Sequence, residues 1–300
     1  MKSPFVRRSS FLKTWKLRNF FGRTWTGRGL QVAEWITGGW RLPTVSVSTM
    51  PKCSLHCGCC PWRSYRDSCN KMAIGPLSTE IFSKCLTNIP LYVLVEFCGA
   101  SEPFLNQSAA DMIRLAWDSG HRMQLMTTLV GLKRRDAEKL QGIKFEKFCV
   151  HAPDSTNMPY NEDRWLGWLE NLRGLKLSPV VFMALGPMSD RVRSACESLG
   201  SLVPIHIQNK KTVSHEEPLF KTGPIECGTY CKGLNYTMLW PNGDLSYCCW
   251  DYVHEYVLGN LSETPYKQLI NGPTRKTIEA KKLSFRADCL CRHCEEAILR

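Results

Sequence analysis

Sixteen cysteines in a chain of 300 residues are the feature that most limits what this sequence can fold into. Disulfide scaffolds with so many cysteines are short, secreted and rich in loops, whereas this chain is long enough for one sizeable core or for a core plus a small appended domain. Its N-terminal residues do not read as a secretory signal, because the segment after Arg7-Arg8 is charged where an apolar stretch would be needed. We therefore expect a cytoplasmic protein that keeps its cysteines reduced for binding metal.

Strand-like and helix-like segments alternate from residue 44 onward. Short β-branched runs predict six strands, at Thr44–Thr49, Val93–Cys98, Gln124–Thr128, Lys147–His151, Val180–Leu185 and Val203–Gln208. Segments with the apolar spacing of helices separate most of them. This alternation predicts an α/β fold with a parallel sheet, arranged as a partial (β/α)6 TIM-like barrel. In barrels of this kind the chemistry lies at the C-terminal ends of the strands.

Composition divides the chain into three predicted parts. Residues 1–43 form a basic, aromatic N-terminal arm with nine Lys or Arg and one acidic residue. Residues 44–222 form the barrel. Residues 223–300 hold seven of the sixteen cysteines and short strands in place of the alternation, and we expect a small α+β domain there. No run approaches the roughly 18–20 apolar residues that a transmembrane helix needs.

The first cysteine cluster follows the first predicted strand directly. Cys53, Cys57 and Cys60 form a CxxxCxxC triplet. Three thiolates from one short loop can hold three irons of a 4Fe–4S cluster and leave the fourth iron open to another ligand. A zinc knuckle or a group of buried thiols is the alternative interpretation of the spacing alone.

The sequence here resembles the radical S-adenosylmethionine (AdoMet) enzymes. The resemblance is carried by the strand, the triplet with Pro61 after it, and the segment at the end of the second predicted strand, Gly99-Ala100-Ser101-Glu102-Pro103. It implies a catalytic, AdoMet-binding 4Fe–4S cluster on the three cysteines. It also implies that Gly99, Ser101, Glu102 and Pro103 hold the methionine amino group. Glycine permits close approach of the backbone, and a carboxylate accepts hydrogen bonds from an ammonium group.

The family resemblance also implies a reaction. The reduced cluster gives one electron to AdoMet, which is cleaved to methionine and a 5′-deoxyadenosyl radical that abstracts a hydrogen atom from the substrate. An external electron donor such as flavodoxin or ferredoxin is then required. Relatives often carry Thr-Asn-Gly after the third strand, and this chain has Thr127-Thr128-Leu129 there, so no cofactor contact is assigned to it. His151 and Asp154 are candidates for cofactor or substrate binding.

A second group of cysteines lies near the C-terminus. Asn242-Gly243-Asp244 predicts a hairpin, which would place Cys248 and Cys249 on the returning strand, facing opposite ways. This geometry leaves open which of the two binds metal. The pattern resembles the SPASM/Twitch domains, which hold an auxiliary 4Fe–4S cluster, and their Gly-x4-Cys spacing selects Cys248. The resemblance then implies the ligands Cys231, Cys248, Cys291 and Cys294, and a four-thiolate zinc site is the alternative.

The partners follow less directly from the sequence. The arm alternates aromatic and basic residues, which suits packing on the barrel edge or peripheral contact with an anionic membrane surface. Nucleic acid is not expected as a partner, although a zinc-stabilised nucleic-acid-binding module is the rival reading from another class. The SPASM/Twitch resemblance implies oxidation of a small or carbohydrate-like substrate, or modification of a ribosomal peptide. No recognisable peptide-binding domain precedes the barrel, which favours the small substrate.

Overall fold

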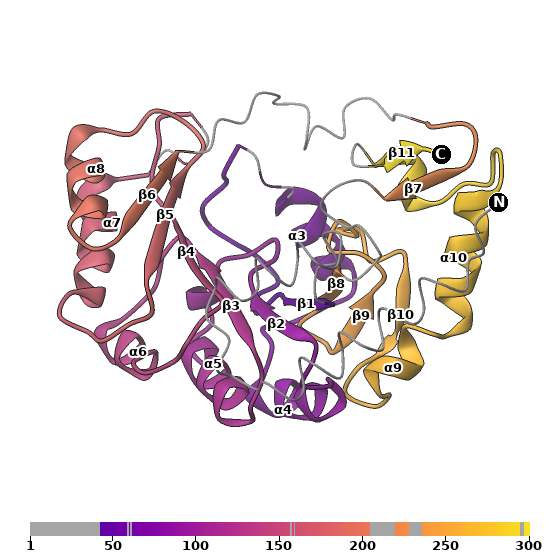
Figure 1. Cartoon of the computed structure of the whole chain (residues 1–300), viewed down its shortest axis with the longest axis horizontal. Helices are drawn as coiled ribbons and strands as arrows, with labels where there is room; N and C mark the ends of the chain where they lie inside the picture. The colour runs from indigo at the N-terminus through magenta and orange to yellow at the C-terminus, as the bar shows by residue number, and fades with distance from the viewer. Residues whose placement is uncertain are drawn as a thin grey trace, which may run out of the picture.

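The computed structural model describes residues 43–58, 60, 62–156, 158, 160–204, 220–227, 236–294 and 297–300. A nine-stranded sheet forms the centre of this part of the chain, and a two-stranded sheet lies near the C-terminus (Figure 1). The large sheet contains β1 (Thr44–Val47), β2 (Leu94–Phe97), β3 (Met123–Thr127), β4 (Lys147–His151), β5 (Val180–Ala184), β6 (Ser201–Pro204), β8 (Tyr236–Leu239), β9 (Asp244–Ser246) and β10 (Val257–Asn260). The small sheet pairs β7 (Ile225–Cys227) with β11 (Ala297–Leu299).

The helices follow the strands along the chain. They are α3 (Trp62–Lys71), α4 (Thr79–Asn88), α5 (Ala109–Asp118), α6 (Arg134–Lys139), α7 (Glu162–Leu169), α8 (Asp190–Glu197), α9 (Tyr266–Leu269) and α10 (Pro273–Leu283). Short 3-10 helices occupy Pro103–Leu105 (η2), Glu170–Leu172 (η3) and Leu290–His293 (η5). Side-chain caps fix several helix starts: the oxygens of Ser78, Asn161 and Ser189 accept the backbone N–H three residues ahead.

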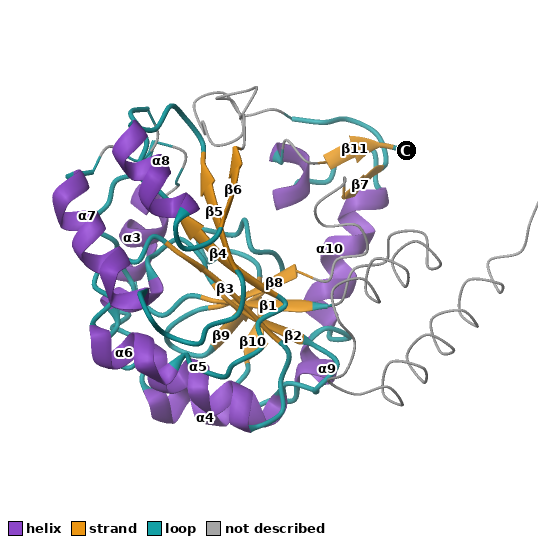
Figure 2. Cartoon of the chain, turned by 60° about the vertical axis from the view of Figure 1, so that its left-hand side comes forward, coloured by secondary structure: helices purple, strands orange, loops and turns teal. Residues whose placement is uncertain are grey.

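Strands β1 to β6 lie side by side in chain order, and every neighbouring pair is parallel. Helices α4 to α8 cover the outer side of this curved sheet (Figure 2). The predicted partial (β/α)6 barrel is confirmed. Strands β1 and β2 are buried throughout, and β4 and β5 are mostly buried, as expected for a sheet covered by helices, whereas Ser201 and Val203 in the edge strand β6 are exposed.

The sheet continues across the expected boundary at residue 223. β8 pairs with β1 in parallel, and β9 and β10 follow it as antiparallel neighbours. The hairpin expected at Asn242-Gly243-Asp244 joins β8 to β9, and Gly243 has a φ of +91°, where glycine is favoured. The division of the chain into three parts at residues 43 and 223 stays a prediction. Backbone hydrogen bonds join β8, β9 and β10 to the sheet of the barrel.

One local expectation is wrong. Cys248 and Cys249 do not lie on the returning strand, because β9 ends at Ser246 and both cysteines occupy the turn after it. The carboxylate of Asp251 accepts the backbone N–H groups of Glu255 and Tyr256, at 3.0 and 2.9 Å. These bonds close the loop that follows both cysteines, and the N–H of Asp251 donates to the carbonyl of Cys248 at 3.1 Å, which closes the turn that carries them.

Asn106 ties the loops around the barrel mouth together. Its buried amide nitrogen donates to the carbonyl oxygens of Thr49 and Leu77, both at 2.9 Å, and its oxygen accepts the N–H of Ser108. We expect Asn106→Ala to lower the free energy of unfolding by about 1–3 kcal/mol, because it removes the donor to the buried Leu77 carbonyl, whereas the Thr49 carbonyl keeps the N–H of Leu77 at 3.0 Å. Urea unfolding of the two proteins checks this. An unchanged midpoint would mean that the loops hold their positions without Asn106.

Among the described residues, no helix combines the length and the apolar character that crossing a bilayer requires. The basic arm, residues 1–43, lies outside the described residues except for Pro43. Its expected contact with the barrel edge or a membrane surface therefore stays a prediction.

Candidate active site

The loop that follows β1 turns its three predicted ligand cysteines inward. Cys53, Cys57 and Cys60 are half-buried, whereas Ser54 and His56 between them are exposed. His56 has a φ of +50°, a conformation that is uncommon for a residue other than glycine. The N–H of Cys60 donates to the carbonyl of Cys57 at 3.1 Å, which closes the second half of the triplet into a turn.

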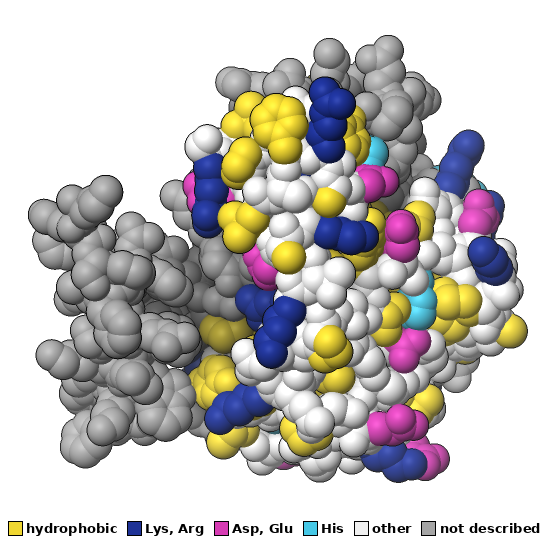
Figure 3. Space-filling view, turned by 90° about the vertical axis from the view of Figure 1, so that its right-hand side faces the viewer, with side chains coloured by type: hydrophobic (Ala, Val, Ile, Leu, Met, Phe, Trp, Pro, Cys, Tyr) yellow, Lys and Arg dark blue, Asp and Glu magenta, His cyan; other side chains and the backbone are white. Residues whose placement is uncertain are grey.

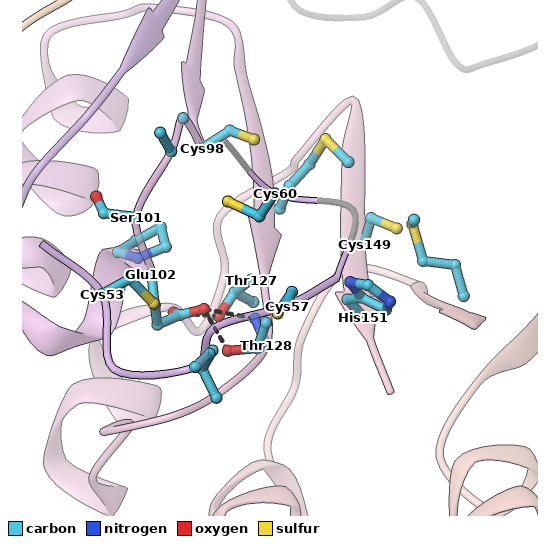
Figure 4. Close-up of a pocket in the computed structure, with 16 residues that line it drawn as sticks. Cys53, Cys57, Cys60, Cys98, Ser101, Glu102, Thr127, Thr128, Cys149 and His151 are labelled. Atoms are coloured by element: carbon cyan, nitrogen blue, oxygen red, sulfur yellow. Dashed lines mark hydrogen bonds between the residues drawn. The ribbon is translucent and has the colours of Figure 1, made fainter. Parts of the chain in front are cut away.

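The triplet forms one wall of an open cavity of about 160 Å³ (Figure 4). The cavity is lined by Cys53, Leu55, Cys57, Cys60, Cys98, Gly99, Ala100, Ser101, Glu102, Pro103, Met126, Thr127, Thr128, Cys149, His151 and Met183. These residues come from the ends of β2 to β5 and from the loops after β1 and β2, which is where a barrel of this kind places its chemistry.

The structure brings all seven predicted residues of the first site together, the three cysteines and the four of the segment Gly99–Pro103. Gly99 has a φ of +101°, and a Cβ atom there would lie 2.9 Å from the hydroxyl of Ser48. The backbone of Gly99 therefore lies close to Ser48, directly after β1, and it also lines the cavity. Pro103 opens helix η2, and its carbonyl accepts the hydroxyl of Thr49 at 3.1 Å.

Glu102 is 3% exposed and joins two neighbouring strand ends. Its Oε1 accepts the hydroxyl of Thr127 at 2.6 Å and the N–H of Phe104 at 3.1 Å. Its Oε2 accepts both the N–H and the hydroxyl of Thr128 at 2.6 Å. Four bonds fill the usual acceptor positions of a carboxylate. Burial raises the pKa of Glu102, and the hydrogen bonds from Thr127, Thr128 and Phe104 act against that rise.

This fourfold bonding gives Glu102 a role that the sequence did not indicate. The carboxylate fixes the segment Thr127-Thr128 against the Gly99–Pro103 loop (Figure 4). The expected hydrogen bond from the AdoMet ammonium group to Glu102 stays a prediction. The ammonium group would have to share a carboxylate oxygen that already accepts two protein donors. Leu129, next along the chain, has a φ of +66° and is fully buried. It takes the left-handed conformation that the glycine of Thr-Asn-Gly would adopt easily.

Two more thiols line the cavity beyond the triplet. Cys98 directly follows the last residue of β2, and Cys149 lies in β4. Cys69, Cys85 and Cys196, in contrast, are buried thiols that do not line the cavity. Burial raises the pKa of Cys98 and of Cys149, so both are neutral thiols near pH 7. The spacing of neither cysteine marks it in the sequence, because each stands alone in a strand-like run.

His151 presents a polar atom that has no hydrogen-bond partner among the described residues. Its Nε2 is buried without a hydrogen bond, and the ring lines the cavity. The nearest carboxylate oxygen, Oδ2 of Asp154, is 3.7 Å away. Asp154 itself accepts the N–H groups of Thr156 and Leu185, at 2.9 and 3.3 Å, so it is held behind the histidine and not in the cavity wall.

The second predicted site is partly described. Cys231 lies outside the described residues, and Cys294 follows helix η5, where its N–H donates to the carbonyl of Cys291. Cys248 packs against a buried cluster that consists of Ile225, Tyr247, Ile278, Cys289 and Cys291. The backbone N–H of Trp250 donates to the sulfur of Cys248 at 3.5 Å. Cys248, Cys289 and Cys291 therefore pack in or against one buried cluster. The sequence did not select Cys289 as a ligand.

Cys249 takes a different direction from Cys248. Its N–H donates to the carbonyl of Tyr236 in β8. Burial raises the pKa of Tyr252, and the thiols of Cys249, Cys60, Cys98 and Cys248 raise it further. Cys248 packs against the cluster that contains Cys289 and Cys291, and Cys249 is not among the residues packed there. This placement favours Cys248 over Cys249 as the auxiliary ligand, which stays a prediction.

The cysteines suit iron–sulfur clusters in chemistry, although the described residues contain no group of three metal-binding side chains already drawn together around a metal position. None of the fourteen described cysteines is in a disulfide. Burial raises the pKa of Cys53, while the backbone N–H groups of Leu55 and Glu102 act against that rise. Metal binding would replace the thiol proton, since thiolates are the ligands. Three inward thiols on one wall of an adjoining cavity fit a cluster that leaves one iron open.

Comparison with known proteins agrees with this geometry. Residues 227–295 match SPASM, an iron–sulfur cluster-binding domain. No protein of curated function matches the sequence. The solved structure of BtrN in complex with AdoMet and 2-DOIA has a TM-score of 0.51 and 12% identity, and the match covers 82% of this chain and 89% of BtrN.

Two further solved structures match at lower scores. AnSMEcpe with bound AdoMet has a TM-score of 0.48 and 12% identity, over 84% of this chain and 86% of that one. SuiB of Streptococcus suis bound to S-adenosylmethionine has a TM-score of 0.45 and 12% identity, over 91% of this chain and 78% of that one.

Residues 227–295 therefore match an iron–sulfur cluster-binding domain, and the chain shares its fold with BtrN, whose structure contains AdoMet. Both findings agree with the resemblance to radical AdoMet enzymes that the sequence shows.

Proposed function

We propose that this protein cleaves AdoMet reductively and uses the resulting radical to oxidise a small, hydroxyl-bearing substrate. The observation that carries the proposal is the single cavity in which Cys53, Cys57 and Cys60 lie beside the segment Gly99–Pro103. A 4Fe–4S cluster bound there would supply one electron to AdoMet and yield a 5′-deoxyadenosyl radical that abstracts a hydrogen atom.

The residues of the chain have separate tasks in this proposal. Cys53, Cys57 and Cys60 lose their protons and bind iron. Glu102 holds the ends of β2 and β3 in register, so that the donors and carbonyls around the cavity stay in place for the AdoMet methionine group. The unpartnered Nε2 of His151 offers a hydrogen bond to a hydroxyl group of the cofactor or the substrate.

The cavity lining supports a small, neutral substrate. Its titratable side chains besides thiols are Glu102, whose oxygens are already bonded, and His151. A strongly charged substrate would need charged partners in a buried site, and the described lining supplies few. Carbohydrate-like alcohols meet this condition. A ribosomal peptide is the alternative, and hydrogen loss from a peptide incubated with the reconstituted protein would favour it.

The C-terminal cysteines are proposed to bind a second 4Fe–4S cluster, with Cys231, Cys248, Cys291 and Cys294 as its ligands. Four protein thiolates leave no open iron, so this centre would not bind AdoMet. Removal of one hydrogen atom from the carbon of an alcohol leaves a radical that must lose a further electron and its hydroxyl proton, which passes to water, to become a carbonyl. The second cluster is the acceptor that we propose for it, and an external donor such as flavodoxin or ferredoxin stays a prediction.

Cys291→Ala is expected to separate the two sites. The variant should keep about half of the iron and should still form 5′-deoxyadenosine under dithionite, because Cys291 lies away from the AdoMet cavity. Iron analysis and chromatography of the nucleoside check this. Loss of both clusters from a soluble, monodisperse variant would mean that the two sites do not assemble independently.

Metal analysis distinguishes the zinc alternative. Protein purified without oxygen should be brown and should contain iron in both sites. A tightly bound zinc ion in place of the second cluster would leave a zinc ribbon at the C-terminus, and the electron-accepting role proposed for this domain would then fail.

A further inference from the structure

A small buried cluster lies beside the active-site cavity and apart from the main core of the barrel. Its members are Tyr65, Cys69, Ala100, Met238 and Trp240. They come from three segments that are distant in the sequence: helix α3, the Gly99–Pro103 segment of the cavity wall, and the end of β8. The cluster therefore packs the C-terminal part of the sheet against both loops that we assign to the cofactors.

Tyr65 closes the loop that carries the cysteine triplet. Its ring is fully buried, and its hydroxyl donates to the carbonyl oxygen of Met50 at 2.9 Å. Met50 lies before Cys53 in the sequence, and Tyr65 lies after Cys60, in α3. One hydrogen bond thus joins the two ends of the loop, and a loop whose ends are fixed has fewer conformations open to it.

Trp240 holds the ring of Tyr65 in place. The two ring centroids are 4.8 Å apart, and the rings are tilted by 33°. The indole N–H of Trp240 donates to the hydroxyl of Ser246 in β9 at 2.8 Å. The surface on the α10 side of the molecule carries charged and hydrophobic side chains next to one another (Figure 3), whereas Trp240 is fully buried and packs inward on α3. Removal of the indole would therefore take this ring contact from Tyr65.

His254 packs edge-on against Trp240 and has an uncommon backbone conformation. The two ring centroids are 4.6 Å apart, at an angle of 85°. His254 has a φ of +58°, which is uncommon for a residue other than glycine. Its Nε2 lies 2.9 Å from Oδ2 of Asp244, a carboxylate that also accepts the side-chain amides of Asn242 and Asn260. A strained backbone persists only where its surroundings hold it, so the residues around the β8–β9 hairpin keep His254 against Trp240.

We propose that Tyr65 and Trp240 are positioning residues for the catalytic cluster: they hold the loop so that the thiols of the triplet face the cavity before iron is bound. This inference rests on the proposed function in that these three thiols are the ligands of that cluster. Ligands that are already in position lose less freedom when the metal binds. The C-terminal hairpin thus supports the first site by packing, independently of the C-terminal cysteines.

Release of iron from the reconstituted full-length protein tests the proposal. The Cys291→Ala background is expected to keep only the first cluster, so a chelator reports on that site alone. We expect Trp240→Leu in this background to lose its iron about tenfold faster than its parent, which is the usual scale when a supporting residue of a metal site is removed.

Three further variants separate positioning from a general loss of packing. Trp240→Phe keeps an aromatic ring beside Tyr65 and should retain part of the slow release. Tyr65→Phe keeps the ring but loses the bond to Met50, so its release rate should lie between those of the parent and of Trp240→Leu. Trp168→Leu removes an indole of α7 from a similar ring pair, in which the centroids are 5.5 Å apart, and should release iron at the parent rate.

Thiol alkylation of the metal-free, full-length chain gives a second measurement that needs no cluster. The protein is treated with iodoacetamide, and mass spectrometry gives the rate at each cysteine. Trp240→Leu should raise the rates at the three thiols of the triplet about tenfold, because the loop opens more often. Cys85 and Cys196 belong to the main core of the barrel and should react as slowly as in the parent protein.

The outcomes separate this inference from the function on which it rests. Equal iron release from Trp240→Leu and Trp168→Leu would overturn the inference. If Trp240→Leu exposes Cys85 and Cys196 to alkylation as well, this variant has unfolded and Tyr65→Phe decides: faster release supports the inference, and release at the parent rate overturns it. A parent protein that binds no iron through the triplet would refute the proposed function, while the alkylation rates of the metal-free chain would still decide the inference.

Discussion

Replacement of Cys53, Cys57 and Cys60 by Ala is expected to abolish reductive cleavage of AdoMet and to leave about half of the iron. The three thiols lie on one wall of the cavity and are the only ligands proposed for the catalytic cluster. The second cluster has its own cysteines and should remain. Chromatography of 5′-deoxyadenosine after incubation with AdoMet and dithionite, together with iron analysis, measures both effects.

Cys149→Ala is the matched control for this triple variant. It removes a thiol from the same cavity, but one in β4 and outside the triplet. We expect it to keep the full iron content. If the triple variant still yields 5′-deoxyadenosine, or if Cys149→Ala loses as much iron as the triple variant, the ligand assignment is wrong.

Glu102→Gln is expected to be the most damaging single substitution near the cavity. A glutamine amide has only one acceptor oxygen, and its NH2 group would replace the other carboxylate oxygen. In one orientation the NH2 group faces the two donors of Thr128, and in the other it faces the donors of Thr127 and Phe104. Each bond to a charged group contributes about 1.5–3 kcal/mol. We expect the free energy of unfolding to fall by about 3–5 kcal/mol, which denaturant titration would measure.

The same substitution should weaken AdoMet binding. The expected loss is about 1.5–3 kcal/mol, whether Glu102 meets the ammonium directly or holds the loop that does. Equilibrium dialysis with AdoMet measures it. Thr128→Val is the control, because it removes one hydroxyl donor and keeps the backbone N–H, and its effect on stability should be smaller. A fully stable Glu102→Gln variant with normal AdoMet affinity would contradict both roles.

The barrel was predictable because its signals are local. β-Branched runs and helical spacing located the first five parallel strands within a few residues, and Lys147–His151 matches β4 at both ends. The sixth predicted strand, Val203–Gln208, overlaps β6 at two residues, and its remainder lies outside the described residues. The cysteine triplet and the segment Gly99–Pro103 were also visible, since each follows a strand. Parallel strands bring those loops to one rim, so sequence order alone placed them in the same cavity.

Features that depend on distant contacts could not be read in this way. The parallel pairing of β8 with β1 joins residues about 190 positions apart, and no local pattern marks it. The bonds between Glu102 and Thr127-Thr128 likewise depend on how two strand ends meet. Leu129 occupies a left-handed conformation that its residue type does not suggest.

The C-terminal region shows the same limit at single residues. The hairpin signal was correct, yet the strand stops at Ser246 and the two adjacent cysteines lie in a turn. Alternation along a strand was therefore the wrong reason to separate Cys248 from Cys249. Lys282 looks in sequence like one of many lysines on a basic helix, and only the packing of α10 shows that it is buried.

The central claim is that this chain is a working radical AdoMet enzyme, and one measurement tests it most directly. The full-length protein, reconstituted without oxygen to about eight irons per chain, is incubated with AdoMet and dithionite, and both products are quantified. The account predicts methionine and 5′-deoxyadenosine in equal amounts. Fully loaded protein that binds AdoMet but forms neither product would contradict it.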